Sequence, residues 1–143
     1  MNASLEETET TLQNREIVVV SNRGPANFSM AEDGHYLIQR SGGGLVTALL
    51  ALAENVSITW LAAAITELEK SWGSGKISLS ENQSPISLQL VPISPEVYAG
   101  YYDVIANPLL WFLQHSMWDF VNSPTITHAT WNAWDNGYVA ANR

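Results

Sequence analysis

An arginine at the end of an apolar run is the first residue in this 143-residue chain that could do chemistry. Arg23, with Asn22 beside it, follows the run EIVVVS at residues 16–21. Ligands of open α/β sheets lie beyond the carboxyl ends of the strands, and a guanidinium there can hold a phosphate through two parallel hydrogen bonds. The alternative is a surface arginine that merely follows a strand.

The second candidate is the glycine run at Gly42, Gly43 and Gly44, which leads into the segment LVTALLAL. Glycine lets a backbone approach a ligand closely, and the amino end of a helix offers free N–H groups and partial positive charge. A diphosphate fits such a place. The run lacks the G-x-G-x-x-G spacing of a dinucleotide fingerprint, so a flexible lead into a helix is the alternative.

Aromatic side chains form the third candidate group: Tyr101, Tyr102 and Trp111, with Asn107-Pro108 between them. An aromatic ring can stack on the C–H face of a sugar, and a phenol can bond to its hydroxyls or to a phosphate. A packed core cluster is the alternative, and the pattern by itself favours it.

The sequence offers neither a metal site nor an evident catalytic centre. Its three histidines share no ligand spacing, cysteine is absent, and the carboxylates are scattered. No G-x-S-x-G elbow is present. We therefore expect no metal site within this stretch.

The scaffold that must position these groups is predicted to be α/β with a largely parallel sheet. β-Branched and apolar runs predict three strands, the first of them buried on both faces. A hairpin is expected around Asp33-Gly34. The predicted strands cover residues 16–21, 57–65 and 84–94, and the predicted hairpin arms cover residues 26–30 and 35–40.

Helices are predicted from their start signals. One follows the glycine run, and a second starts at Ser94-Pro95-Glu96. A third is expected to restart at Asn107-Pro108, which places the aromatic group on two short helices. Residues 66–76 predict a loop or a short helix, and residues 128–143 are expected to be helical in their second half.

Composition limits the partners. The net charge is −8 with only six Lys and Arg, which argues against a nucleic-acid or anionic-membrane partner. No apolar run has transmembrane length, and residues 1–14 read as a mobile acidic tail rather than a signal peptide. With no cysteine, the chain fits a reducing cytoplasm.

Four motif blocks, in this order, resemble the trehalose-6-phosphate synthase family of retaining glycosyltransferases. They are VVVSNRGP, SGGGLVTALLAL, SPEVYAGYYDVIANPLLWFLQH and WNAWDNGYVAANR. The resemblance implies the two-domain GT-B fold, of which residues 15–143 would form an incomplete, Rossmann-like, acceptor-side amino-terminal domain. The second domain would be absent from this chain.

The resemblance also implies roles for individual residues. Arg23 corresponds to the arginine that binds the acceptor's phosphate, usually glucose-6-phosphate, and Tyr102 and Trp111 to the aromatic pair of the acceptor sugar pocket. Gly43 and Gly44 correspond to the glycine loop over the donor diphosphate, usually in UDP-glucose. The implied reaction transfers glucose with retention to give trehalose-6-phosphate. The leaving nucleotide is assisted by an arginine and a lysine of the second domain, and no metal takes part, which also implies that this stretch holds no cofactor and no catalytic residue.

The chain departs from the family pattern in two places. The HDYH-type segment and the second domain do not appear, so the chain alone is expected to be inactive. Residues 61–72, LAAAITELEKSW, stand where many members have a GWxG-like segment, which leaves the acceptor's identity open.

A second interpretation is a truncated pseudoenzyme or regulatory sugar-phosphate-binding module. Such a module would associate with a complete synthase or form a homo-oligomer. A third interpretation, an unrelated α/β domain with a glycine loop, needs all four motif blocks to coincide by chance.

Overall fold

A computed structural model of the chain describes residues 16–53, 56–80, 84–117, 121 and 123–143. The predicted tail at residues 1–14 lies outside the described residues. The chain divides into two compact units, Met1–Pro92 and Ile93–Arg143.

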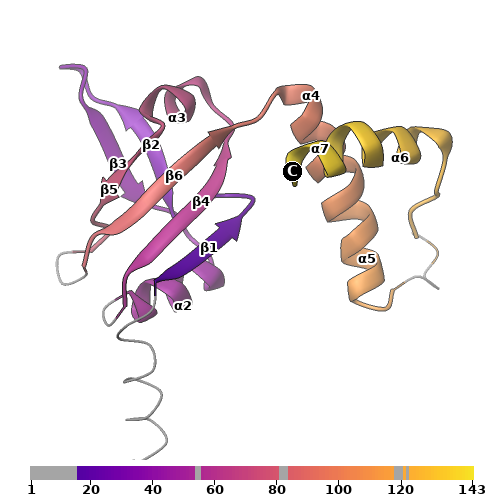
Figure 1. The fold of residues 1–143 in the computed structure, drawn as a ribbon, viewed down its shortest axis with the longest axis horizontal. Coiled ribbons are helices and arrows are strands. Elements are labelled where there is room, and N and C mark those ends of the chain that lie inside the picture. The colour runs from indigo at the N-terminus through magenta and orange to yellow at the C-terminus, as the bar shows by residue number, and fades with distance from the viewer. Residues whose placement is uncertain (1–15, 54–55, 81–83, 118–120, 122) are drawn as a thin grey trace, which may run out of the picture. The chain divides into compact units, whose positions relative to one another are not determined.

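The first unit is built on a four-stranded sheet in the order β1-β4-β6-β5 (Figure 1). Its strands are β1 (Ile17–Ser21), β4 (Ile58–Ala64), β6 (Ile86–Pro92) and β5 (Ser74–Ile77). β1, β4 and β6 run parallel, as the apolar runs predict, and β5 adds an antiparallel edge. The prediction of a loop or short helix at residues 66–76 missed β5, because SGKI has too little apolar alternation to signal a strand.

The core of this unit lies on one face of the sheet. Alternate residues of the central strands point into it, and Trp60 and Leu88 are among its fully buried side chains. Helix α2 (Gly44–Leu52) contributes Val46 and Leu50 to the same core. The partly buried Phe28 and Ile38 pack against it.

The prediction that the first strand is buried on both faces is wrong. In β1, Val18 is 58% exposed and Val20 is 75% exposed, while Ile17 and Val19 pack against the core. β1 is an edge strand, and the buried residues that pack with it all lie on one face of the sheet. A β-branched run therefore marked the strand correctly but overstated its burial, because Val favours strands whether one or both faces are covered.

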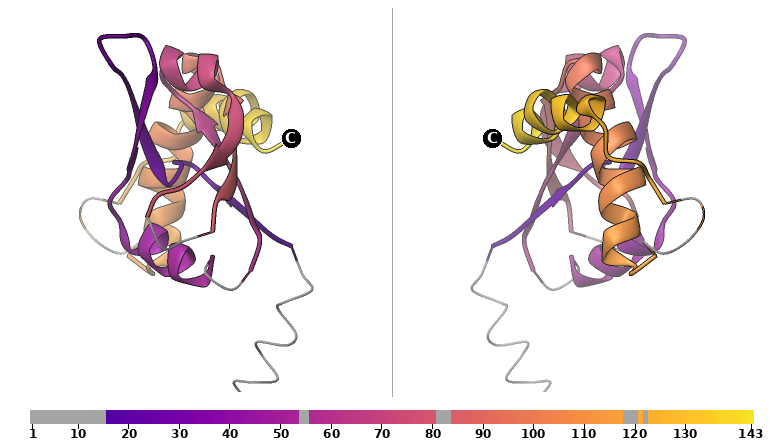
Figure 2. Two further views of the ribbon diagram at one scale, coloured as in Figure 1. Left: turned by 90° about the vertical axis from the view of Figure 1, so that its left-hand side faces the viewer. Right: turned by 90° about the vertical axis from the view of Figure 1, so that its right-hand side faces the viewer.

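The predicted hairpin is confirmed. Its arms, β2 (Ala26–Met30) and β3 (Tyr36–Arg40), pair antiparallel, and their turn projects away from the sheet (Figure 2). Gly34 takes a φ of 85° there, a left-handed conformation that glycine adopts without strain, and its amide donates to the Ala31 carbonyl.

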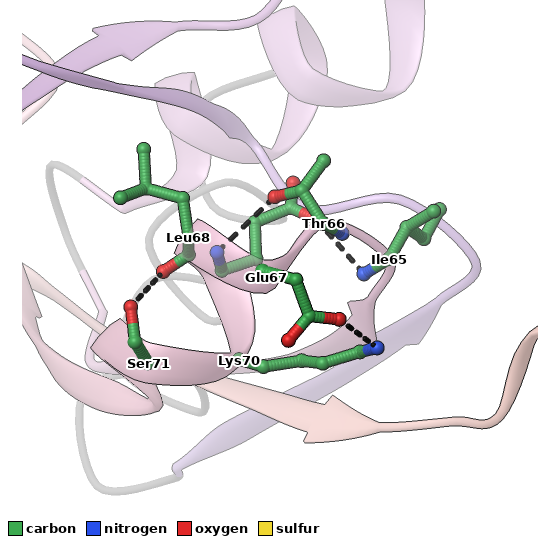
Figure 3. A network of polar contacts seen from close by, with 7 residues as sticks. Ile65, Thr66, Glu67, Leu68, Lys70 and Ser71 are labelled. Atoms are coloured by element: carbon green, nitrogen blue, oxygen red, sulfur yellow. Dashed lines mark hydrogen bonds and ion pairs between the residues drawn. The ribbon is translucent and has the colours of Figure 1, made fainter.

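A buried carboxylate organises the chain after β4. Helix α3 (Glu67–Trp72) begins with Thr66 as its N-cap, and the Thr66 hydroxyl accepts from the Glu69 amide (Figure 3). The Glu69 carboxylate returns to accept from the amides of Ile65 and Thr66, both at 2.8 Å. This capping box satisfies the amides at the start of the helix, with Glu69 only 8% exposed.

We expect Glu69→Ala to lower the free energy of unfolding by about 1–2 kcal/mol, because the amides of Ile65 and Thr66 would lose the carboxylate that accepts their hydrogen bonds. The matched control is Glu67→Ala on the same helix. Glu67 is exposed and forms a surface ion pair with Lys70, so its loss should cost less than about 0.5 kcal/mol. Urea denaturation of both variants measures the difference, and equal midpoints would contradict it.

The second unit consists of two helical segments that cross. The first runs through α4 (Pro95–Tyr98), η1 (Ala99–Leu110) and α5 (Trp111–Gln114), and the second through α6 (His128–Ala133), η2 (Trp134–Tyr138) and α7 (Val139–Ala141). Ser94 caps α4 as predicted, with its hydroxyl accepting from the Val97 amide. The second segment is helical from His128, earlier than expected, because Thr127 and Thr130 form a capping box.

The predicted restart at Asn107-Pro108 is wrong. The helix continues through Pro108 without a break, and Figure 1 shows an uninterrupted coil from α4 to α5. Over Ala99–Leu110 the hydrogen bonds are of the π-helical type, from residue i to i+5, and Pro108 lies inside this stretch. The aromatic group therefore lies on one helical segment rather than on two short helices.

Among the residues that the structure describes, no helix combines the length and the apolar character needed to cross a membrane.

Candidate functional site

The turn that carries Arg23 is held by groups other than its own side chain. The buried Trp60 donates its indole N–H to the Ser21 hydroxyl at 2.7 Å, and that hydroxyl donates to the Arg23 carbonyl at 2.7 Å. The Asn22 carbonyl accepts from the Ala63 amide of β4. The turn is thus fixed to the sheet, while the Arg23 side chain is exposed at the carboxyl end of β1.

Ser41 joins this turn to the glycine run. Its amide donates to the Pro25 carbonyl at 2.8 Å, and its hydroxyl donates to the Gly24 carbonyl at 3.1 Å. Ser41 directly precedes Gly42, so the residues after Arg23 and the start of the glycine loop lie side by side. Within the first unit, the structure brings together two of the three predicted groups.

The glycine run leads into α2 as predicted. Gly43 takes a φ of 132°, a backbone conformation that favours glycine, and no side chain caps the helix. The Thr47 hydroxyl donates to the Gly43 carbonyl, and Arg40 donates a guanidinium N–H to Thr47 at 2.8 Å. The amino end of α2 therefore presents uncapped amides beside one cation, which is the electrostatic setting that favours an anion.

Tyr102 and Trp111 belong to the second unit and have different neighbours there. Tyr102 is half-buried and stacks on Tyr98 with ring centroids 5.7 Å apart. Trp111 is 42% exposed and stacks on His115, with centroids 4.4 Å apart. The buried residues of this helix are Ile105 and Leu109, so neither ring belongs to its innermost positions.

An apolar cavity of about 330 Å³ lies in the second unit. Neither Tyr102 nor Trp111 is among the side chains that line it. Its lining residues are Ile105, Leu109, Leu110, Leu113, Ile126, Thr130, Trp131 and Trp134.

Burial raises the pKa of the Tyr101 phenol above its ordinary value of 10, and nearby Tyr98, Tyr138 and Tyr102 raise it further. A raised acid pKa means that the folded state holds the proton more tightly. The associated stability is fully present below the unfolded pKa and is lost as the pH rises from there through the higher folded pKa.

We therefore expect the melting temperature of the helices, followed by circular dichroism, to be lower at pH 11 than at pH 9. Tyr101→Phe should reduce this loss, because it removes the group that must ionise. Circular dichroism melts at both pH values measure the change, with Tyr36→Phe as the control outside this ring cluster. An unchanged loss in Tyr101→Phe would contradict the prediction.

In the described part of the chain, no three His, Cys, Asp or Glu side chains come close enough together to hold a metal ion.

Comparison with known proteins decides the family. The sequence profile described as glycosyltransferase family 20 matches residues 15–143. The chain belongs to glycosyltransferase family 20. A trehalose-6-phosphate synthase of Mycobacterium sp. (strain JLS) is 35% identical to this family 20 chain over 130 residues, which cover 90% of the chain and 24% of the relative. A trehalose-6-phosphate synthase of Mycolicibacterium smegmatis is 34% identical over 137 residues, which cover 94% of this chain and 24% of the relative.

Solved structures agree on the fold of this family 20 member. One, described as trehalose-6-phosphate from E. coli bound with UDP-2-fluoro glucose, superposes with a TM-score of 0.51 and 19% identity over 84% of this chain and 22% of its own. A trehalose-6-phosphate synthase called OtsA superposes with a TM-score of 0.51 and 21% identity, over 85% of this chain and 23% of its own. The predicted α/β class with a parallel sheet is thereby confirmed. The chain spans about a quarter of the length of the relatives it matches.

Sequence reasoning missed the residues that hold the Arg23 turn and the glycine loop in place. Ser21, Ser41 and Trp60 act through hydrogen bonds between segments far apart in the chain, and no local spacing reports such bonds. Arg40 was also overlooked as a cation at the glycine loop. Its position two residues before the glycine run was the one available signal.

Proposed function

We propose that this chain is the acceptor-side, amino-terminal part of a retaining glycosyltransferase that makes trehalose-6-phosphate. The donor is a nucleotide glucose of the UDP-glucose type, and the acceptor is glucose-6-phosphate. Family membership supports the reaction class, and relatives called trehalose-6-phosphate synthase support the product. The bound UDP-2-fluoro glucose of the E. coli structure supports the donor.

One observation about this chain carries the proposal: the Ser41 link between the Arg23 turn and the glycine loop. The exposed Arg23 guanidinium binds the phosphate of the acceptor by charge-assisted hydrogen bonds. The amides at the amino end of α2, with Gly43 and Gly44, bind the donor diphosphate. Tyr102 and Trp111 contact the acceptor sugar.

In this proposal, residues 1–143 bind the acceptor but do not turn it over. Departure of the nucleotide develops negative charge on the diphosphate, and fixed positive groups stabilise that charge in the transition state. The family resemblance places those groups, an arginine and a lysine, in the second domain. One such donor is worth about 10²- to 10³-fold in rate, so losing several removes measurable activity.

Titration calorimetry of the purified chain tests the proposal with three ligands: glucose-6-phosphate, glucose and inorganic phosphate. We expect glucose-6-phosphate to bind at least tenfold more tightly than either of its halves. No binding, by a chain that circular dichroism shows to be folded, would overturn the acceptor assignment. Release of UDP from UDP-glucose and glucose-6-phosphate would contradict the inactivity of the chain alone.

A further inference from the structure

The helical segment that carries Trp111 ends with an imidazole stacked on the Trp111 indole. His115 follows Trp111 by four positions, and residues with this spacing are neighbours on the surface of a helix. Side chains of a helix lean toward its amino end, so the His115 ring reaches back over Trp111. The two rings stack with centroids 4.4 Å apart and an interplanar angle of 28°.

A hydrogen bond fixes the imidazole in this place. The Nδ1 atom of His115 lies 2.7 Å from the carbonyl oxygen of Trp111. A carbonyl oxygen only accepts, so in this bond Nδ1 carries the hydrogen and donates it. The His115 amide donates to the same carbonyl at 3.1 Å. The imidazole is therefore tied to both the backbone and the ring of a single residue, Trp111.

The end of the helix also fixes the backbone from which the imidazole extends. His115 is the C-cap of α5, and Ser116 turns the chain with a φ of 55°. The Ser116 amide donates to the Leu113 carbonyl at 3.2 Å, and the Met117 amide donates to the Phe112 carbonyl at 3.0 Å. These bonds satisfy carbonyls that the last turn of a helix leaves without helical donors. The imidazole therefore starts from a defined backbone position rather than from a frayed end.

The stack orients Trp111 without burying it. Trp111 is 42% exposed although the imidazole covers part of it, and a second ring contact, with Phe112, is edge-on with centroids 5.7 Å apart. A side chain that must be immobilised when a ligand binds costs affinity. An indole that a stacked ring already holds avoids this cost and keeps exposed surface for the C–H face of a sugar.

We propose that His115 is a positioning residue, which holds the Trp111 indole in the orientation that contacts the acceptor sugar. His115 acts through Trp111 and needs no contact of its own with the ligand. The role in binding rests on the proposed function, whereas the stack of the two rings does not.

The stack is tested first, on the full chain without ligand. The ring current of an indole shifts the NMR resonances of protons held over its face. Trp111→Leu should therefore move the imidazole resonances of His115 and leave those of the exposed His128 unchanged. His115 resonances that stay in place in Trp111→Leu would overturn the stack.

Binding of glucose-6-phosphate, measured by titration calorimetry, tests the role. His115→Ala should weaken binding about three- to tenfold, which corresponds to the loss of one stacked aromatic pair, and Trp111→Ala should weaken it about tenfold. The double variant should bind no more weakly than Trp111→Ala, because His115 acts through that ring. His115→Phe keeps a ring and loses the Nδ1 donor, so it should recover part of the affinity. Gln114→Ala, an exposed change in the same turn, is the control and should bind like the native chain.

A variant of Ser116 separates positioning of the indole from capping of the helix. Glycine adopts a φ of 55° without strain, so Ser116→Gly should raise the melting temperature of the helices. Combined with His115→Ala, it should restore thermal stability, followed by circular dichroism, but not the affinity for glucose-6-phosphate. Affinity restored by Ser116→Gly would show that His115 only caps the helix.

The remaining outcomes each decide one claim. The positioning role is overturned if His115→Ala binds like the native chain, if His115→Phe binds no better than His115→Ala, or if the losses multiply in the double variant. If the folded native chain does not bind glucose-6-phosphate, the proposed function fails and the role in binding fails with it. The NMR shifts still decide whether the imidazole holds the indole.

Discussion

Arg23→Ala is expected to weaken binding of glucose-6-phosphate by about 10- to 100-fold, the loss of one charge-assisted, bidentate phosphate contact. The fold should not change, because Ser21 bonds to the backbone carbonyl of Arg23 and leaves its exposed side chain out of the network. Titration calorimetry measures the dissociation constants, and circular dichroism checks that the variant is folded.

Two further variants sharpen this test. Arg23→Lys keeps the charge but loses the planar fork, so its affinity should fall between those of the native chain and Arg23→Ala. Lys76→Ala removes a charge from β5, at the sheet edge opposite β1, and should bind like the native chain. If Arg23→Ala and Lys76→Ala weaken binding equally, the effect is one of net charge and the phosphate contact is refuted.

Gly137→Ala is expected to destabilise the second unit by about 3 kcal/mol, at the upper end of what overpacking usually costs. A Cβ at Gly137 would stand 2.5 Å from the carbonyl carbon of Gly100 and 2.6 Å from both its Cα and the amide nitrogen of Tyr101. All three are backbone atoms of η1, so relief requires the two crossing helices to separate.

A graded series of glycine replacements checks this prediction in urea denaturation. At Gly100 the added Cβ would lie 3.0 Å from the Cα of Gly137, so Gly100→Ala should cost less. At Gly42 it would meet nothing within 4 Å, so Gly42→Ala should change stability by no more than about 1 kcal/mol. A Gly137→Ala variant as stable as Gly42→Ala would show that the helices do not cross at this point.

Local patterns predicted those elements whose formation depends on neighbouring residues. β1, β4, β6, the Asp33-Gly34 hairpin and the helix after the glycine run follow from β-branched runs, turn chemistry and apolar spacing. The capping of α4 by Ser94 follows for the same reason. Each of these signals acts within a few residues, which is the range that a single sequence reports.

The mistaken predictions concern contacts beyond that range. Burial of β1 on both faces depends on what covers the sheet, and a run of valines carries no information about that. The restart at Pro108 was inferred from the usual effect of proline on a helix, but this helix continues through the proline. β5 forms because its backbone pairs with β6, not because its own residues favour a strand.

The candidate site divides in the same way. Arg23, the glycine run and the aromatic residues were candidates by residue type, and the family resemblance selected Gly43, Gly44, Tyr102 and Trp111 and implied the roles. Folding supplied their support, namely the bond from Trp60 to Ser21, the bonds from Ser41 to Gly24 and Pro25, and the unbroken helical segment that carries Tyr102 and Trp111. The hydrogen bonds join residues that are distant in the chain, and the segment continues through a proline, so these relations exist only once the backbone has folded.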